Sequence, residues 1–302
     1  MFVVKYRKIF YLLSAILIIL SITAISIWGL KLSIDFKGGS IYEIEYSDTR
    51  PDQGNVIASI APLKLDASVR ATGEKGYIIR MKDITPAEKT SLNNILGTFG
   101  TTTEKRFDSV GPLLGVEALR KSFASIILVI LAIVFFIAFA FRHVSEPISS
   151  WKYGIIAIIA LVHDVIVPTG VFAILGHYKG YEIDTLFITA LLVVLGFSVH
   201  DTIVVFDRVR ENLKNASGKK LFSDIVGDSI NQTFTRSINT SLTTLLALIV
   251  LYFVGGESTQ HFSLALIIGI VAGTYSSIFL GSPLLVTIWK WQEGRKNKKG
   301  KK

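Results

Sequence analysis

The chain has 302 residues, half of them hydrophobic, a formal net charge of +9 and no cysteine. This composition is typical of integral membrane proteins, and the lack of cysteine excludes disulfides and thiolate metal sites. The sequence contains no glycine-rich phosphate loop, HExxH motif or three-ligand spacing, so we expect no cofactor, no metal site and no enzymatic activity.

Six apolar stretches are long enough to cross about 30 Å of hydrocarbon, which predicts an α-helical polytopic membrane protein. They are Ile9–Leu30, Ser122–Phe141, Tyr153–Gly176, Thr185–Phe206, Ser237–Val254 and Phe262–Trp289. The first has no obvious cleavage site, so we interpret it as a retained signal anchor.

Lysine and arginine gather in four regions that share one side if the six helices alternate. These regions precede helix one, separate helices two and three, separate helices four and five, and form the basic tail of residues 290–302. Both termini are therefore expected to be cytoplasmic. Membrane lipid explains the positive charge better than nucleic acid does.

Residues 31–121 form the one soluble-looking block, between the first helix (1–30) and helices two to six (122–289). The block alternates predicted strands and helices in the order strand, helix, strand, strand, helix, strand. The strands are Ile41–Tyr46, Ala67–Thr72, Gly76–Lys82 and Thr101–Phe107, and the helices are Asp52–Pro62 and a second capped at Thr85 that runs to Phe99. This order suggests a small α+β ferredoxin-like extracytoplasmic domain.

Gly38 and Gly39 lie where helix one enters this domain. Two interpretations stay open: a tight turn that needs a positive φ, or a hinge that lets the domain move.

Asp201 lies deep in helix four beside His200, and Arg236 opens helix five. A charge at the centre of a membrane helix costs roughly 3 kcal/mol and usually marks an ion pathway. Both charges are expected in the inner half, roughly 24 Å and 28 Å below the outer helix ends, so an Asp201–Arg236 pair is plausible. The alternatives are a static ion pair or an arginine that extends to the interface.

Asp164 is a second intramembrane acid, four residues before Pro168 in helix three. A kink there would suit a moving gate or a helix bent for packing. His163–Asp164 and His200–Asp201 look like catalytic dyads, but adjacent helical residues are expected to point apart.

Helix five opens with three turns of polar side chains that need hydrogen-bond partners or water. Helix six carries small residues at fourfold spacing, among them Gly269, Gly273 and Ser277, which predicts close helix packing.

Seven motifs in order resemble the SecF family of bacterial protein-export subunits, relatives of proton-driven RND transporters. They are Asp35–Gly39, Val110–Pro112, Ala160–Asp164, Gly196–Thr202, Asp207–Asn212, Asn231–Ser241 and Gly273–Ser277. His200 departs from the asparagine that family members often have, and it adds a titratable group beside Asp201.

The resemblance implies a SecD-like partner, a SecYEG channel, a translocating preprotein and use of the proton gradient in the bacterial cytoplasmic membrane. It assigns the essential acid to Asp201 and the essential arginine to Arg236, and we expect Asp164 and His200 to join the proton relay. Two rival hypotheses are a half-transporter of small amphiphiles and a non-transporting assembly factor of the export channel.

Overall fold

The computed structural model describes residues 2–142, 148–216 and 220–299. The chain divides into two compact units, one of residues 32–123 and one of the residues before and after them. We call these the outer unit and the membrane unit.

The membrane unit contains six helices that are long and apolar enough to cross a membrane, counted over the described residues. Its elements are α1 (Phe2–Lys5), α2 (Arg7–Trp28), the later part of α6 (Pro112–Ala140), α7 (Ser150–Lys179), α8 (Thr185–Asn215), α9 (Phe222–Val254), α10 (Glu257–Tyr275), η2 (Ser276–Gly281) and α11 (Ser282–Lys299). The chain is therefore a multi-pass membrane protein.

Three of these helical segments form the centre of the unit, and the others surround it. The apolar stretches of α7, of α8 and of the span Thr259–Gly294, which runs through α10 and η2 into α11, are 56%, 50% and 67% buried, whereas those of α2, α6 and α9 are at most 17% buried. Close approach of α10 to α8 depends on glycine, since a Cβ at Gly269 would lie 2.2 Å from Val194. The surrounding helices leave apolar faces available to lipid or to other helices.

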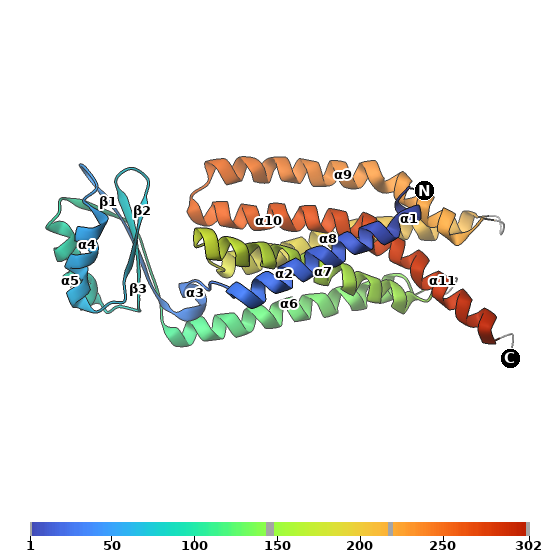
Figure 1. The fold of residues 1–302 in the computed structure, drawn as a ribbon, viewed down its shortest axis with the longest axis horizontal. Helices are drawn as coiled ribbons and strands as arrows, with labels where there is room; N and C mark the ends of the chain where they lie inside the picture. The colour runs from blue at the N-terminus through green and yellow to red at the C-terminus, as the bar shows by residue number, and fades with distance from the viewer. Residues whose placement is uncertain (1, 143–147, 217–219, 300–302) are drawn as a thin grey trace. The chain divides into compact units, whose positions relative to one another are not determined.

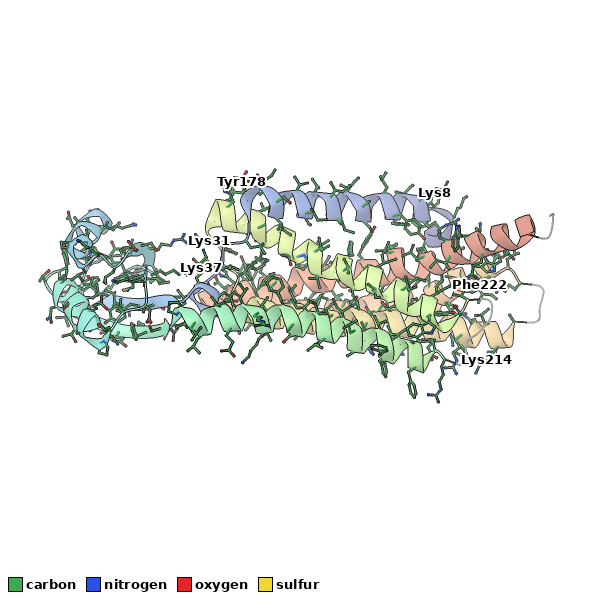
Figure 2. The ribbon with its side chains drawn as sticks, turned by 90° about the horizontal axis from the view of Figure 1, so that it is seen from below. Lys8, Lys31, Lys37, Tyr178, Lys214 and Phe222 are labelled. Atoms are coloured by element: carbon green, nitrogen blue, oxygen red, sulfur yellow. The ribbon has the colours of Figure 1, made fainter. Side chains whose placement is uncertain are left out.

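Figure 1 shows α9 running alongside α10 within this unit. In Figure 2, Lys8, Lys214 and Phe222 lie at one end of the unit, and Lys31 and Tyr178 lie at the other. The start of α2 and the end of α8 therefore meet at the same end, as alternating helices require.

Three predicted spans differ clearly from the structure. The fifth begins at Phe222 instead of Ser237. The sixth is not one α-helix, because the π-helical turn η2 separates α10 from α11. The second begins at Pro112 instead of Ser122. Its first turns carry charged side chains among apolar ones, with Glu117 and Lys121 forming an ion pair of 2.7 Å, and these charges lower the hydropathy of the segment.

The outer unit is a four-stranded antiparallel sheet in the order β2-β3-β1-β4. Its elements are β1 (Gly39–Tyr46), α4 (Gln53–Ile60), η1 (Ala61–Leu63), β2 (Ser68–Thr72), β3 (Gly76–Met81), α5 (Pro86–Gly97) and β4 (Thr102–Val110). The order of strands and helices agrees with the sequence pattern. Thr85 and Glu88 form the predicted capping box at the start of α5.

The core of the outer unit lies between the sheet and its two helices. Alternate residues of β1, Tyr42, Ile44 and Tyr46, are at most 3% exposed and pack against side chains of α4 and α5 such as Val56 and Leu92. The period-two alternation of β1 therefore determines which face of the sheet carries the helices.

The two glycines at the base of this unit occupy a tight junction. Gly38 ends the short helix α3 (Ile34–Lys37) with φ of 77°, and a Cβ there would lie 2.6 Å from the backbone of Pro112. Gly39 has φ of 132°, and its Cβ would lie 2.7 Å from the carbonyl oxygen of Met81. The positive φ values and the close backbone contacts support the turn interpretation, because a hinge needs free space.

Candidate functional site

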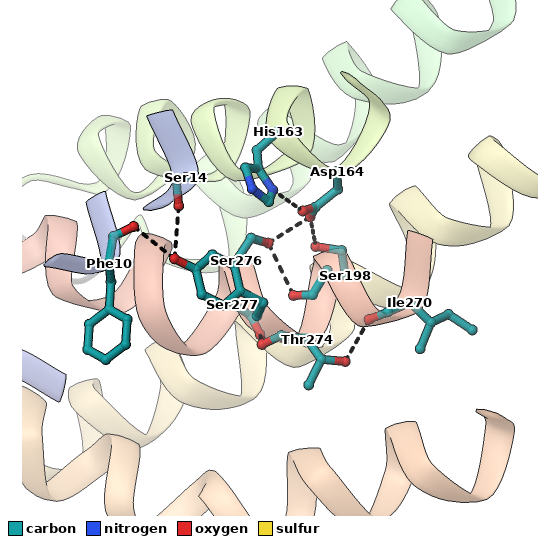
Figure 3. Close-up of polar contacts among 11 residues, drawn as sticks. Phe10, Ser14, His163, Asp164, Ser198, Ile270, Thr274, Ser276 and Ser277 are labelled. Carbon is teal, nitrogen blue, oxygen red and sulfur yellow. Dashed lines mark hydrogen bonds and ion pairs between the residues drawn. The ribbon is translucent and has the colours of Figure 1, made fainter. Parts of the chain in front are cut away.

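Asp164 lies at the centre of the membrane unit and is fully buried. Its Oδ2 accepts hydrogen bonds from Ser198 Oγ of α8 at 2.5 Å and from Ser276 Oγ of η2 at 2.8 Å (Figure 3). Its Oδ1 lies 2.9 Å from Nδ1 of His163. This Asp164 cluster therefore joins α7, α8 and the π-helical turn through one carboxyl group.

The contact between His163 and Asp164 corrects the expectation that these adjacent side chains point apart. Their Cβ atoms diverge on the helix, but Nδ1 is the imidazole nitrogen nearer the backbone, and the Asp164 side chain can turn toward it. The buried Nε2 of His163 has no hydrogen-bond partner within the described residues.

The neighbourhood of His163 extends to α2. The His163 ring lies 5.9 Å from the ring of Tyr275 on α10. The Tyr275 hydroxyl donates to the carbonyl oxygen of Phe10 at 2.8 Å and accepts from Ser14 Oγ at 3.3 Å (Figure 3). The helix that leads into the outer unit is therefore bonded to the residue that packs beside the Asp164 cluster.

Asp201 occupies a different environment, on α8 beside α9. It is 3% exposed, and its Oδ2 has no hydrogen-bond partner in the part of the chain that the structure describes. Ser237 of α9 is itself 1% exposed, and its hydroxyl is the hydrogen-bonding group of α9 that lies beside the Asp201 carboxyl. His200, the next residue, is exposed. Asp201 is therefore a buried carboxyl group with unused hydrogen-bonding capacity.

The predicted Asp201–Arg236 ion pair is not formed. Among the described residues, no contact within 4.0 Å joins the two side chains, although Arg236 acts on Asp201 electrostatically. Arg236 is exposed and lines a pocket of about 260 Å³ together with Asp207, Arg208 and Gln232. Asp201 is 3% exposed and Arg236 is exposed, so the two side chains lie in different environments.

Some of the polar side chains at the predicted start of helix five bond neighbouring helices, and others are exposed. Gln232 Oε1 accepts from Arg208 Nε at 2.6 Å and from Asn212 Nδ2 at 3.0 Å, which joins the last turns of α8 to α9. Ser241 bonds Thr274 of α10 at 2.6 Å. Other polar side chains of α9 remain exposed, including Asn231, Thr235, Arg236 and Asn239.

Sequence reasoning did not assign the partners of Asp164. Ser198, Ser276 and Tyr275 fall inside motifs that we noted, but a hydroxyl in a membrane helix can always bond its own backbone, so sequence alone gives no reason to select them. Over the described residues, no group of three or more His, Cys, Asp or Glu side chains could hold a metal ion.

Comparison with known protein families gives two matches. Residues 91–291 match the family described as protein export membrane protein SecD/SecF, C-terminal, and residues 24–49 match the SecD/SecF GG motif. A protein translocase subunit SecF of Thermobaculum terrenum is 46% identical over 299 residues, covering 94% of this chain and 93% of that protein. Another from Anaerolinea thermophila is 40% identical, covering 96% of this chain and 94% of that protein.

Two solved structures have similar folds. The crystal structure of SecDF, a translocon-associated membrane protein from Thermus thermophilus, matches with a TM-score of 0.81 and 29% identity over 95% of this chain. A SecDF structure in the super-membrane-facing form matches with a TM-score of 0.60 and 26% identity over 99% of this chain. The present chain spans 38% and 39% of the length of those chains.

Proposed function

This chain belongs to the SecF family of protein translocase subunits, and from that premise we propose that it uses the proton gradient to promote protein translocation, with Asp201 as the proton acceptor. The observation that carries the proposal is the buried Oδ2 of Asp201, which has no hydrogen-bond partner among the described residues. A buried carboxyl group in this state binds a proton more readily than one whose oxygens are already bonded.

Arg236 is proposed as the second element of the relay. It is exposed on α9 and lines a pocket with Asp207 and Arg208, and this position supports a cycle in which Arg236 and Asp201 are unpaired for part of the time. Loss of the proton from Asp201 would leave a buried negative charge, and approach of Arg236 would offset it. The relay therefore alternates between a proton and an arginine as the partner of one carboxyl group.

The proton supplies a limited free energy to this cycle. One proton crossing the membrane releases about 2.3 kcal/mol per 100 mV, which biases a two-state equilibrium about fiftyfold. That is enough to favour one helix arrangement over another and too little to unfold a domain. A small movement of α8 against α9, carried to the outer unit, fits this amount of free energy.

A SecD-like subunit is the partner that α9 supports best. Exposed amide, hydroxyl and guanidinium groups on α9, such as Thr235, Arg236 and Asn239, would be costly against lipid. Another polar helix surface would satisfy them. The SecDF chains that resemble this one are more than twice its length, which leaves room in them for such a partner portion.

The outer unit is proposed to be a ferredoxin-like extracytoplasmic domain, with both chain termini cytoplasmic. The support is its antiparallel strand order β2-β3-β1-β4 with two helices on one face. We further propose that it meets the emerging preprotein near a SecYEG channel, and that it acts by binding, because fold alone gives no catalytic role.

The test follows a preprotein stalled in inverted membrane vesicles after ATP is exhausted. Vesicles contain the wild-type chain or Asp201→Asn with the SecD-like subunit and the channel, with and without a proton gradient. We expect gradient-driven completion in the wild type and completion at the no-gradient level in Asp201→Asn. Equal gradient-driven completion in both would contradict the proposal and favour the assembly-factor hypothesis.

Ser263→Ala is the matched control for the loss of a buried polar group. Ser263 is fully buried on α10, and the one hydrogen bond of its hydroxyl within the described part of the chain is to the carbonyl oxygen of Thr259 on its own helix. Its loss leaves no buried charge without a partner, so gradient-driven completion should remain. Loss of completion in this control as well would mean that the assay reports general damage to the bundle.

A further inference from the structure

We propose that His163 and Asp164 form a second proton-holding site, in which Asp164 is a neutral carboxylic acid that donates from Oδ1 to Nδ1 of a neutral His163. The inference deepens the proposed proton coupling, and its functional meaning rests on that proposal. It places His163, Ser198 and Ser276 in one site through their contacts with Asp164, none of which involves Asp201.

The pattern of hydrogen bonds fits a carboxylic acid. Oδ2 receives two hydroxyl donors, from Ser198 and Ser276, as a carbonyl oxygen with two lone pairs can. Oδ1 faces a single nitrogen, Nδ1 of His163, at 2.9 Å. If Oδ1 carries the proton and donates it to Nδ1 of His163, the carboxyl hydroxyl, Oδ2 and Nδ1 all have a hydrogen-bond partner.

Burial favours the neutral form over a carboxylate. Asp164 and His163 are both fully buried, and the one ion pair recorded for Asp164 among the described residues is with His163. A carboxylate beside a neutral imidazole would be a buried charge without a counter-charge, which costs several kcal/mol. The neutral pair leaves only the Nε2–H of His163 without a partner, at a cost of about 1–3 kcal/mol.

Among the described residues, the surrounding helices bring no charged group into contact with His163 and Asp164. Tyr275 on α10 is the titratable side chain that faces His163, at 5.9 Å between rings. On α2, Tyr11 is bonded to Thr287 and Arg7 to the carbonyl oxygen of Val4, and Lys8 is exposed. On α8, Asp201 and the exposed His200 follow Ser198, and the η2 segment Ser276–Gly281 has no titratable residue.

Release of the proton uses both nitrogens of the imidazole. The Oδ1–H bond of Asp164 breaks and an Nδ1–H bond of His163 forms, while the Nε2–H proton passes to a water molecule. The products are an Asp164 carboxylate, a neutral His163 protonated on Nδ1, and a hydronium ion. Ser198 and Ser276 are positioning residues, because their hydroxyls hold Oδ2 and so direct Oδ1 toward the imidazole.

The π-helical turn gives the site a means of sensing movement. Ser276 is the first residue of the turn, and π-helical turns often occur at functional sites. The turn presents the Ser276 hydroxyl to Asp164 across the helix boundary, so a shift of α10 against α7 would remove one of the two donors from Oδ2.

Infrared spectroscopy of the full chain in lipid vesicles at neutral pH tests the proposal. We expect a carbonyl stretching band of a protonated carboxylic acid that shifts in D2O, disappears in Asp164→Asn and persists in Asp201→Asn. In Ser198→Ala and Ser276→Ala the band should move to higher frequency, because the carbonyl oxygen loses a donor. In Ser263→Ala the frequency of this carbonyl band should not change.

A spectrum in which Asp164→Asn removes no such band would overturn the proposal. If Asp164→Asn does not fold, an unshifted band in both serine variants would overturn it equally. The measurement needs no gradient, partner or preprotein, so its failure is distinct from a failure of gradient-driven translocation.

Discussion

The two units of this chain differ in where their charged groups lie. The outer unit places its ion pairs on the surface, for example Lys105 with Glu45 at 2.6 Å, where water screens them. The membrane unit buries Asp164 and Asp201 inside the bundle. Surface pairs contribute little to stability, whereas buried carboxyl groups are costly and need a specific reason to be there. This contrast supports the proposal that proton chemistry belongs to the membrane unit and a binding role to the outer unit.

We expect the largest effect from Gly38→Ala, which tests whether the junction at Gly38 is a fixed turn or a hinge. In Gly38→Ala a Cβ would lie 2.6 Å from the Pro112 backbone at a φ of 77°, so we expect a loss of about 3 kcal/mol or more in the stability of that unit. Amide hydrogen exchange of the sheet in the full chain measures it. Gly97→Ala is the control, because no atom lies within 4 Å of its added Cβ. Equal protection in both variants would restore the hinge interpretation.

A smaller effect is expected in the membrane unit for Ser276→Ala. Removing one of two hydroxyl donors from the buried Asp164 should cost about 2 kcal/mol. Thermal unfolding in detergent, compared with Ser263→Ala, measures the difference. A loss no greater than in the control would mean that the bond to Asp164 is not a significant constraint.

The next smaller effect is a loss of stability of the outer unit at alkaline pH. Burial raises the pKa of Tyr42 and of Tyr46 from 10.0 to about 12. Their raised values give stability that is complete below pH 10 and lost as the pH rises toward about 12. Denaturant titration of the full chain should show this loss, and Tyr46→Phe should reduce it. A loss of the same size in Tyr46→Phe would contradict the assignment.

The smallest effect concerns the surface pair of the outer unit. Lys105 lowers the pKa of Glu45, so the contribution of that carboxylate is present above its unfolded pKa and lost as the pH falls through the folded value. We expect Glu45→Gln to change the unfolding temperature very little and to remove a weak dependence on salt. A large loss would contradict the contrast between the two units.

The sequence predicted the elements of both units better than it predicted their contacts. Hydropathy located six spans, and the capping box at Thr85 located the start of α5, because both signals are local. The π-helical turn was not predicted, since nothing local in Ser276–Gly281 distinguishes it from an α-helix.

The candidate site was predicted only as single residues. Asp164 and Asp201 were selected because a charge in an apolar segment is visible in the sequence. Their environments depend on which helices approach, so the donors Ser198 and Ser276 and the separation of Arg236 from Asp201 required the three-dimensional arrangement.

The central claim is that a proton reaches Asp201 as the preprotein moves. Its most direct measurement is proton flux, followed with a pH-sensitive dye in vesicles that hold the chain, its SecD-like partner, the channel and a stalled preprotein. Flux should begin when the preprotein is released in the wild type and in Ser263→Ala, and it should be absent in Asp201→Asn. Equal flux in Asp201→Asn and in the wild type would contradict the account.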